Sequence, residues 1–184
     1  MVFWDQNIIQ ILSVLTLISN AIIVLYLLDF IYYKINKRFL LNSLWNYAGK
    51  KAILFIFIVS FVATMGSLTF SEVLNFNPCV LCWYQRIFMY PIMFLSIAAL
   101  YIKDKRIIPY ILFLSILGFP LATYHYLGQI DNNVSLPCDV IGYSSKCSET
   151  FFMQFGYITI PFMALSAFAL IIIICLIAKK TEKD

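Results

Sequence analysis

The segment Phe155–Ala178, FGYITIPFMALSAFALIIIICLIA, decides the fold class of this chain. It holds no charged side chain, and it is long enough for a helix that crosses a bilayer, which needs about 20 apolar residues. The whole chain of 184 residues is 62% hydrophobic and 12% charged, whereas soluble domains average about 25% charged residues. One water-soluble core cannot bury so much apolar surface. The sequence therefore predicts an all-α membrane protein.

Four other apolar segments precede this one and are also long enough to span a membrane. Their approximate bounds are Ile8–Phe30, Ala52–Phe70, Cys79–Ile102 and Ile107–Leu127. Short connections join the segments, so we expect consecutive helices to pack antiparallel. The first segment lacks the basic residues that precede the apolar part of a signal peptide, which favours a retained helix. Five transmembrane helices are therefore expected.

Lysine and arginine residues indicate how the helices are oriented. Of the 13 basic residues, 11 lie between the first and second segments, between the third and fourth, or after the fifth. With five spans these places fall on one side of the membrane, and the positive-inside rule assigns that side to the cytoplasm. We expect the N-terminus outside and the C-terminus in the cytoplasm. The short basic clusters between apolar segments do not form the pattern of a nucleic-acid-binding surface.

Cys79 and Cys82 form a Cys-x-x-Cys at the outer mouth of the third span. Asn77-Pro78 precedes the pair and marks the start of a helix, because proline is favoured in the first turn. A helix N-terminus stabilises a thiolate through its unpaired N–H groups and its dipole. Residues three apart share a helical face, so one disulfide can join the pair. We interpret the two cysteines as a redox pair suited to thiol–disulfide exchange.

Arg86 lies on the same helical face, four residues after Cys82. A charged side chain within a span is costly and suggests a function. A cation at this position would lower a thiol pKa and could bind an oxygen-bearing ring. The alternative is an interfacial arginine that extends toward water, with Trp83 and Tyr84 as ordinary interfacial aromatic residues. We favour the functional interpretation because the charge and the cysteines share a face.

Two more cysteines, Cys138 and Cys147, lie in the largest outer loop. They could form a structural disulfide worth about 2–3 kcal/mol, or a mobile disulfide offered to a partner protein, which the nearby Cys-x-x-Cys favours. His125 is the only histidine and lies near the outer end of the fourth span. It could pack between tyrosines or assist proton transfer to a reduced cofactor. Cys175 lies deep in the fifth span and is expected to be a buried apolar residue.

The stretch Asn77–Pro91, NPCVLCWYQRIFMYP, resembles the DsbB/BdbC family of disulfide-bond-formation membrane proteins. Leu136-Pro137-Cys138, Cys147 and the segment Gly156–Pro161, GYITIP, are similar to the same family, nearer its BdbC branch. The resemblance covers roughly residues 52–178. It implies a four-helix transmembrane bundle that oxidises a thioredoxin-fold partner and passes the electrons to a membrane quinone.

The resemblance divides the chain into three parts. Residues 52–178 would form the four-helix core in the bacterial inner membrane. Residues 1–51 would add one N-terminal transmembrane helix and a cytoplasmic linker, and residues 179–184 a cytoplasmic tail. The first span lies outside the family's core, and the spacing between Cys138 and Cys147 is much shorter than in the DsbB branch.

The resemblance also implies roles for the site residues. Cys79 and Cys82 match the pair next to the quinone (ubiquinone or menaquinone), with Cys82 as the thiolate that contacts it. Arg86 matches the arginine that supports quinone binding, and we add His125 to this site from its position alone. Cys138 and Cys147 match the loop pair that exchanges with an extracytoplasmic DsbA-like partner, with Cys138 as the favoured site of the mixed disulfide.

Two other classes of function remain open at this point. Four outer cysteines could ligate zinc or copper(I), but a thiolate metal site gives no reason for Arg86, so we expect no metal. The second alternative is a non-enzymatic scaffold with two structural disulfides. Four free thiols after metal removal would favour the metal site, and slow reduction of the Cys79–Cys82 disulfide would favour the scaffold.

Overall fold

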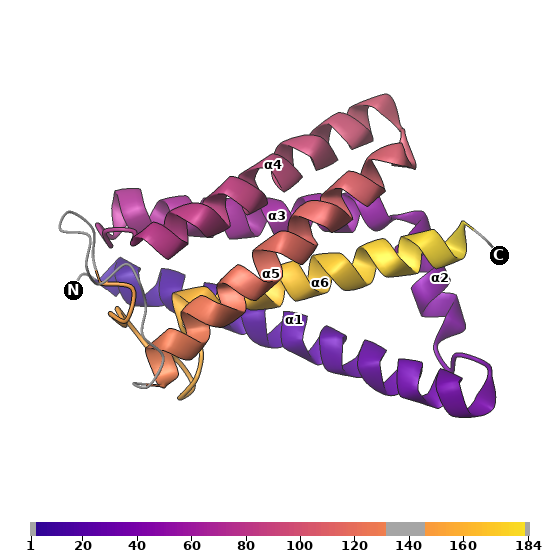
Figure 1. Ribbon diagram of the computed structural model, residues 1–184, viewed down its shortest axis with the longest axis horizontal. Coiled ribbons are helices and arrows are strands. Elements are labelled where there is room, and N and C mark those ends of the chain that lie inside the picture. The colour runs from indigo at the N-terminus through magenta and orange to yellow at the C-terminus, as the bar shows by residue number, and fades with distance from the viewer. Residues whose placement is uncertain (1–2, 132–145, 183–184) are drawn as a thin grey trace.

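The computed structural model describes residues 3–131 and 146–182 (Figure 1). Within these two ranges the regular secondary structure is helical, apart from one isolated β-bridge between Gln154 and Ile158. The prediction of an all-α protein is therefore confirmed. The elements are α1 (Phe3–Asn36), α2 (Asn42–Lys50), α3 (Ala52–Leu68), the π-helical turn η1 (Thr69–Val73), α4 (Val80–Ile102), the 3₁₀ turn η2 (Lys105–Ile107), α5 (Ile108–Ile130) and α6 (Ile160–Thr181).

The described part of the chain holds five helical segments that are long and apolar enough to cross a membrane. They are Gln6–Asn36, Ala52–Val73, Val80–Ile102, Lys105–Ile130 and Ile160–Thr181. Their number and order agree with the five predicted spans, and the chain is a multi-pass membrane protein.

The start of the fifth span was predicted wrongly. The apolar segment begins at Phe155, but α6 begins only at Ile160. Phe155 and Gly156 have positive φ angles of 52° and 79°, which a right-handed helix does not allow. Pro161 lies in the first turn of α6, where its missing N–H group costs no hydrogen bond. The apolar residues before it form a turn, because hydropathy alone does not distinguish a helix from an apolar turn at its end.

The segment expected to be a linker contains the short helix α2. Its Trp45 side chain is buried and donates a hydrogen bond from Nε1 to Asp29 Oδ2 at 2.6 Å. Asp29, near the end of α1, also accepts hydrogen bonds from the backbone N–H groups of Leu40 and Leu41 at 2.8 and 3.1 Å. One buried carboxylate thus fixes the turn by which the chain leaves α1 and enters α2.

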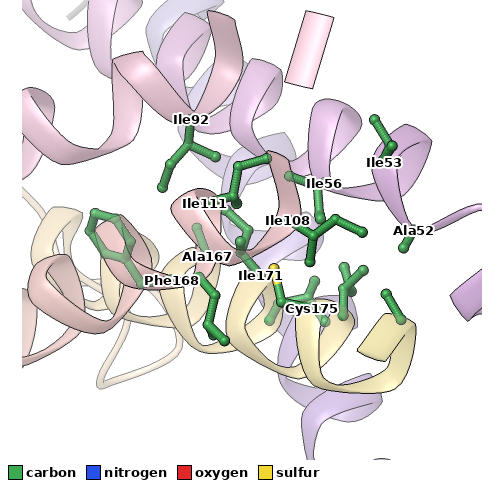
Figure 2. Packing of buried hydrophobic residues seen from close by; sticks show 14 of the residues in the cluster. Ala52, Ile53, Ile56, Ile92, Ile108, Ile111, Ala167, Phe168, Ile171 and Cys175 are labelled. Atoms are coloured by element: carbon green, nitrogen blue, oxygen red, sulfur yellow. The ribbon is translucent and has the colours of Figure 1, made fainter. Parts of the chain in front are cut away.

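The main hydrophobic core lies where α3, α4, α5 and α6 meet (Figure 2). Each of these helices contributes a fully buried isoleucine, namely Ile56, Ile92, Ile111 and Ile171. Cys175 belongs to the same cluster and has no exposed surface, so its interpretation as a buried apolar residue is confirmed. Gly118 of α5 faces the buried ring of Phe168 in α6, which allows these two helices to approach closely.

The first helix packs on this core rather than standing apart from it. α1 lies mainly against α6 (Figure 1). Ser166 of α6 donates a hydrogen bond to Asn20 Oδ1 of α1 at 2.9 Å. Hydrogen bonds between polar side chains of neighbouring helices are a common source of association within membranes, so this pair holds α1 at a defined position along α6.

We expect a side chain at Gly118 to destabilise the core. A Cβ atom placed there would overlap ring atoms of Phe168, which is fully buried and has little room to move aside. Overpacking of this kind costs about 1–3 kcal/mol, so Gly118→Ala should lower the thermal unfolding temperature of the protein in detergent. The additional change Phe168→Leu, which makes room, should recover part of the loss. An unchanged unfolding temperature for Gly118→Ala would contradict this packing.

Candidate functional site

The N-terminus of α4 carries the Cys-x-x-Cys, as the sequence predicted. Cys79 is the N-cap residue, and its Sγ atom accepts a hydrogen bond from the backbone N–H of Cys82 at 3.4 Å. The two Sγ atoms lie 3.2 Å apart, and both cysteines are free thiols. A disulfide requires about 2.05 Å between its sulfur atoms. The pair is therefore a dithiol whose sulfur atoms need only a short approach to form a bond.

His125 of α5 lies directly against this pair. Its Nε2 atom is 3.5 Å from Cys79 Sγ and 3.1 Å from the carbonyl oxygen of Cys147. The other ring nitrogen, Nδ1, is 2.8 Å from Nε2 of Gln85 in α4. The Gln85 amide donates to Nδ1, so Nε2 carries the ring proton and directs it toward the sulfur and the carbonyl oxygen. Gln85 thereby fixes the tautomer and the orientation of the imidazole.

The surroundings of Cys79 favour its thiolate form. The hydrogen bond with Cys82 is the largest cause, and together with the hydrogen bond of His125 it lowers the pKa of Cys79 to about 4. Burial opposes this shift, because Cys79 is only 4% exposed. The resemblance had assigned the reactive thiolate to Cys82. In the dithiol form seen here, the better stabilised thiolate is that of Cys79.

Cys147 approaches the same place from the segment before α6. Its side chain is fully buried and takes part in a disulfide. The Sγ atoms of Cys79 and Cys147 and a ring nitrogen of His125 all lie within 4.8 Å of one another. The structure thus brings together Cys79, Cys82, Cys147 and His125, whereas Cys138 lies outside the described residues.

A group of aromatic rings packs together beside the cysteines. Phe151 and Phe152 line the small cleft that also contains Cys79 and Cys147. The Phe76 ring stacks on Phe151 with 4.7 Å between ring centroids, and Phe70 of η1 packs on Phe152 at 5.5 Å. These four residues, Phe70, Phe76, Phe151 and Phe152, are called the aromatic cover below. They add apolar surface to one wall of this cleft, where the segment before α6 meets the end of η1 and the residues before α4.

Arg86 is buried and turned toward α3, not extended toward water. It is 8% exposed, and it donates hydrogen bonds from Nε to Ser67 Oγ at 2.9 Å and from a terminal nitrogen to the Ser67 carbonyl oxygen at 3.0 Å. Tyr90 donates a further hydrogen bond to Ser67 Oγ at 3.4 Å. The guanidinium also lies over the Trp83 ring, 5.0 Å from its centroid. The alternative of an interfacial arginine that extends toward water does not describe this position.

A largely apolar cavity of about 270 Å³ lies below Cys82. Its walls come from α1, α3, α4 and α6, and its polar end is formed by Ser67, Cys82, Gln85 and Arg86. The cavity is close in size to small-molecule pockets, which have volumes of about 300–1,000 Å³ and few polar groups. Cys79 and His125 do not line this cavity and instead line the small cleft with Cys147, to which Cys82 also contributes. The two sulfur atoms of the Cys-x-x-Cys therefore have different neighbours.

Gln85 and Ser67 are the two site residues that sequence reasoning missed. Gln85 is a polar side chain inside an apolar span, three residues after Cys82, and this spacing was the available signal. Ser67 carried no comparable signal, because serine is common in membrane helices and its position below Arg86 depends on how α3 packs against α4.

Comparison with known proteins identifies the family. The sequence profile described as disulfide bond formation protein DsbB matches residues 49–178. The SPbeta prophage-derived disulfide bond formation protein B of Bacillus subtilis is 45% identical over 122 residues, which are 66% of this chain and 81% of that protein. Disulfide bond formation protein C of the same organism is 44% identical over 141 residues, which are 73% of this chain and 99% of that protein.

A more distant similarity reaches a probable disulfide formation protein of Coxiella burnetii, which is 38% identical over 117 residues, covering 63% of this chain and 79% of that protein. No solved structure matches this chain. The matched region, residues 49–178, contains α3, α4, α5 and all but the last three residues of α6, together with Cys79, Cys82, Cys138 and Cys147, and it leaves out α1. This chain belongs to the DsbB family of disulfide bond formation proteins.

Proposed function

We propose that this protein is a membrane thiol:quinone oxidoreductase, which reoxidises an extracytoplasmic thioredoxin-fold disulfide donor and passes the electrons to a quinone. One observation carries the proposal: Cys79 contacts the disulfide-bonded Cys147 on one side, while its partner Cys82 lines the apolar cavity on the other. Two redox pairs in series, followed by an apolar pocket, form a route for electrons from a protein thiol to a lipid-soluble acceptor. Family membership supports the disulfide-forming half of this route.

The orientation of the protein follows from its charges. Lys103, Lys105 and Arg106 at the α4–α5 connection and Lys179 and Lys180 at the end of α6 lie at the opposite helix ends from Cys79. The positive-inside rule assigns the basic ends to the cytoplasm. We therefore place the Cys79 end at the outer face of the bacterial inner membrane, where a secreted disulfide donor can reach it.

In the first exchange, a thiolate of the reduced partner attacks the loop disulfide, for which we propose Cys138 as the site of the mixed disulfide. The second partner thiol displaces Cys138, so the partner leaves oxidised and the loop pair holds both electrons as two thiols. In the second exchange, the Cys147 thiolate attacks Cys79 of an oxidised Cys79–Cys82 pair, and Cys82 leaves as a thiolate. Cys138 then displaces Cys79, which restores the loop disulfide.

The proposed cycle accounts for the cysteine states of the structure, since Cys147 in a disulfide with Cys79 and Cys82 as thiols would follow the second exchange. His125 Nε2 lies within reach of Cys79 Sγ. It can stabilise Cys79 as a leaving thiolate, which explains its position on the sulfur side of the pair. The second exchange releases Cys82 as a thiolate at the polar end of the cavity. Cys82 can therefore be the thiolate that contacts the quinone, although Cys79 is the better stabilised thiolate when both cysteines are thiols.

The cavity fits a quinone, ubiquinone or menaquinone. It is apolar along its walls and presents a thiol and a buried arginine at one end. A bound quinone would supply an oxidant that accepts two electrons and two protons. The chain contributes a sulfur donor at Cys82, a fixed positive charge at Arg86, and an apolar enclosure that limits water. Ser67 holds the guanidinium in place through two hydrogen bonds.

A metal site is the weaker alternative. The ligand atoms of Cys79, His125 and Cys147 are close enough to hold an ion, but cysteine binds metals as a thiolate, and Cys147 is disulfide-bonded here. Thiol counting on purified protein after metal removal separates the two functions. Two disulfides in the resting protein support the relay, whereas four reactive outer thiols would support the metal site.

Cys82→Ala should abolish quinone reduction driven by a reduced thioredoxin-fold partner, because it removes the sulfur that borders the cavity. The loop pair should still oxidise one equivalent of partner in a single turnover. Quinone absorbance measures the first reaction and gel analysis of partner thiols the second. Cys175→Ala, which alters a buried cysteine of α6 away from the site, is the matched control and should behave as wild type. Continued quinone reduction by Cys82→Ala would disprove the assignment.

Arg86→Met should raise the KM for quinone by about tenfold or more, the effect of losing roughly 1.4 kcal/mol of binding. Arg86→Lys should restore only part of the affinity, since lysine keeps the charge but cannot make both hydrogen bonds to Ser67. The rate of partner oxidation by the loop pair should not change in either variant. Equal quinone KM values for Arg86→Met and wild type would rule out a role of Arg86 in quinone binding.

The pKa of Cys79 predicts the pH dependence of its alkylation. Because this pKa is lowered to about 4, the thiolate should be present above about pH 4 and disappear as the pH falls through that value. Cys82→Ala removes the largest cause of the shift, and His125→Ala removes a smaller one. Both variants should move the midpoint of Cys79 alkylation, followed by mass spectrometry, to higher pH, with the larger movement for Cys82→Ala. Identical midpoints in all three proteins would contradict the proposed stabilisation.

A further inference from the structure

One long wall of the cavity below Cys82 comes from α1, which lies outside the region matched to the family. The contributing positions recur at intervals of three and four residues and thus form one face of the helix. They are Leu12, Leu15, Thr16, Ile18, Ser19 and Ile22. The four-helix core supplies the thiol and the arginine, but α1 is needed to complete the enclosure.

The face of α1 that lines the cavity is apolar in character, although it includes two hydroxyl groups. Thr16 Oγ1 donates to the carbonyl oxygen of Leu12 at 2.9 Å, and Ser19 Oγ donates to that of Leu15 at 3.0 Å. Both hydroxyls therefore satisfy their donors within their own helix, as Ser and Thr in membrane helices commonly do. The surface offered to a ligand is therefore mostly that of leucine and isoleucine side chains.

α1 is held mainly by α6 and by the turn that leads to α2. The Ser166–Asn20 hydrogen bond and the buried Asp29 fix it to α6 and to the α2 turn. α1 comes close to α3 at the end of the molecule that carries Cys79, where Leu12 of α1 packs against Gly66 of α3. Farther along, α1 and α3 diverge (Figure 1), and the cavity lies between them, bordered by Ile22 on α1 and Ile58 on α3.

The cavity is long in the direction of the helices. Ile22 follows Leu12 by ten residues on α1, which corresponds to about 15 Å at the helical rise of 1.5 Å per residue. Its polar end at Cys82 and Arg86 is level with Gly66, and its far end near Ile22 is lined by aliphatic side chains. Such a shape suits a ligand with a polar ring at one end and a hydrocarbon tail at the other.

We propose that α1 forms the tail-binding wall of the quinone site, so that the isoprenoid tail of the quinone lies between α1 and α3 while its ring lies at Cys82 and Arg86. This inference rests on the proposed function. A membrane lipid shares the hydrocarbon chemistry of the tail, but the redox-active thiol beside the cavity is suited to the quinone ring.

Photolabelling of the full-length protein tests the proposal. The probe is a quinone that carries a photoreactive diazirine on its tail, and labelled peptides are identified by mass spectrometry. We expect labelling within residues 15–22 of α1 that an excess of unmodified quinone suppresses. Labelling confined to α3, α4 and α6, or labelling of α1 that only added phospholipid suppresses, would overturn the proposal. This measurement on the unaltered chain does not depend on how any variant folds.

A pair of variants provides the matched comparison. Ser19→Trp fills the cavity face of α1, whereas Ala21→Trp places the same ring on an exposed face of the same helix, two residues away. Ser19→Trp should weaken equilibrium quinone binding by at least about tenfold, equivalent to roughly 1.4 kcal/mol, and should suppress α1 labelling. Ala21→Trp should match wild type in both. Equal binding by both variants would overturn the proposal.

The outcomes also separate this inference from the proposed function. If the wild-type protein neither binds quinone nor reduces it with electrons from a thiol partner, the proposed function itself fails. If the wild-type protein reduces quinone and Cys82→Ala does not, while α1 is unlabelled and Ser19→Trp binds normally, only the role of α1 is wrong.

Discussion

The N-terminus of α4 is the constraint on which the rest of the site depends. Because Cys79 is the N-cap and Cys82 lies in the first turn, their sulfur atoms are held 3.2 Å apart. The helix directs one sulfur toward His125 and Cys147 and the other toward the cavity. A single helical turn thus carries both a thiol beside His125 and Cys147 and a thiol that borders the cavity. The remaining features, including the Gln85–His125 hydrogen bond and the Ser67–Arg86 contacts, arrange the surroundings of these two sulfur atoms.

Much of the fold could be predicted from the sequence because the membrane imposes strong rules on composition. Long apolar segments without charge indicate spans, and Asn77-Pro78 before Cys79 indicates where a helix begins. Those predictions depend on local sequence only. The start of α6 was wrong because the apolar residues 155–159 satisfy the same hydropathy rule while their backbone forms a turn. The helix α2 was missed because it is short and its stability comes from contacts with Asp29 and α6.

The site could be predicted only in part, because some of its residues are brought together by packing between helices and not by local sequence. The spacing of Cys79, Cys82 and Arg86 along one helix fixes their relative positions, so their association was visible in the sequence. The positions of His125 and Cys147 depend on how α5 and the segment before α6 pack against α4. Those contacts place His125 at the sulfur atoms instead of at the cavity. No local pattern in the sequence around Tyr124-His125-Tyr126 contains that information.

The aromatic cover has a consequence for selectivity. Phe151 and Phe152 line the cleft that contains Cys79 and Cys147, and these two cysteines are only 4% and 0% exposed. Thiol–disulfide exchange requires the attacking sulfur to reach the disulfide directly, so a small free thiol in the surrounding solution meets a steric barrier here. Cys147, in contrast, already lies beside Cys79 and needs no entry from solution. On the proposed route, kinetic insulation of this kind would keep the oxidising pair from being discharged by low-molecular-weight reductants, so that its electrons come from the thioredoxin-fold donor.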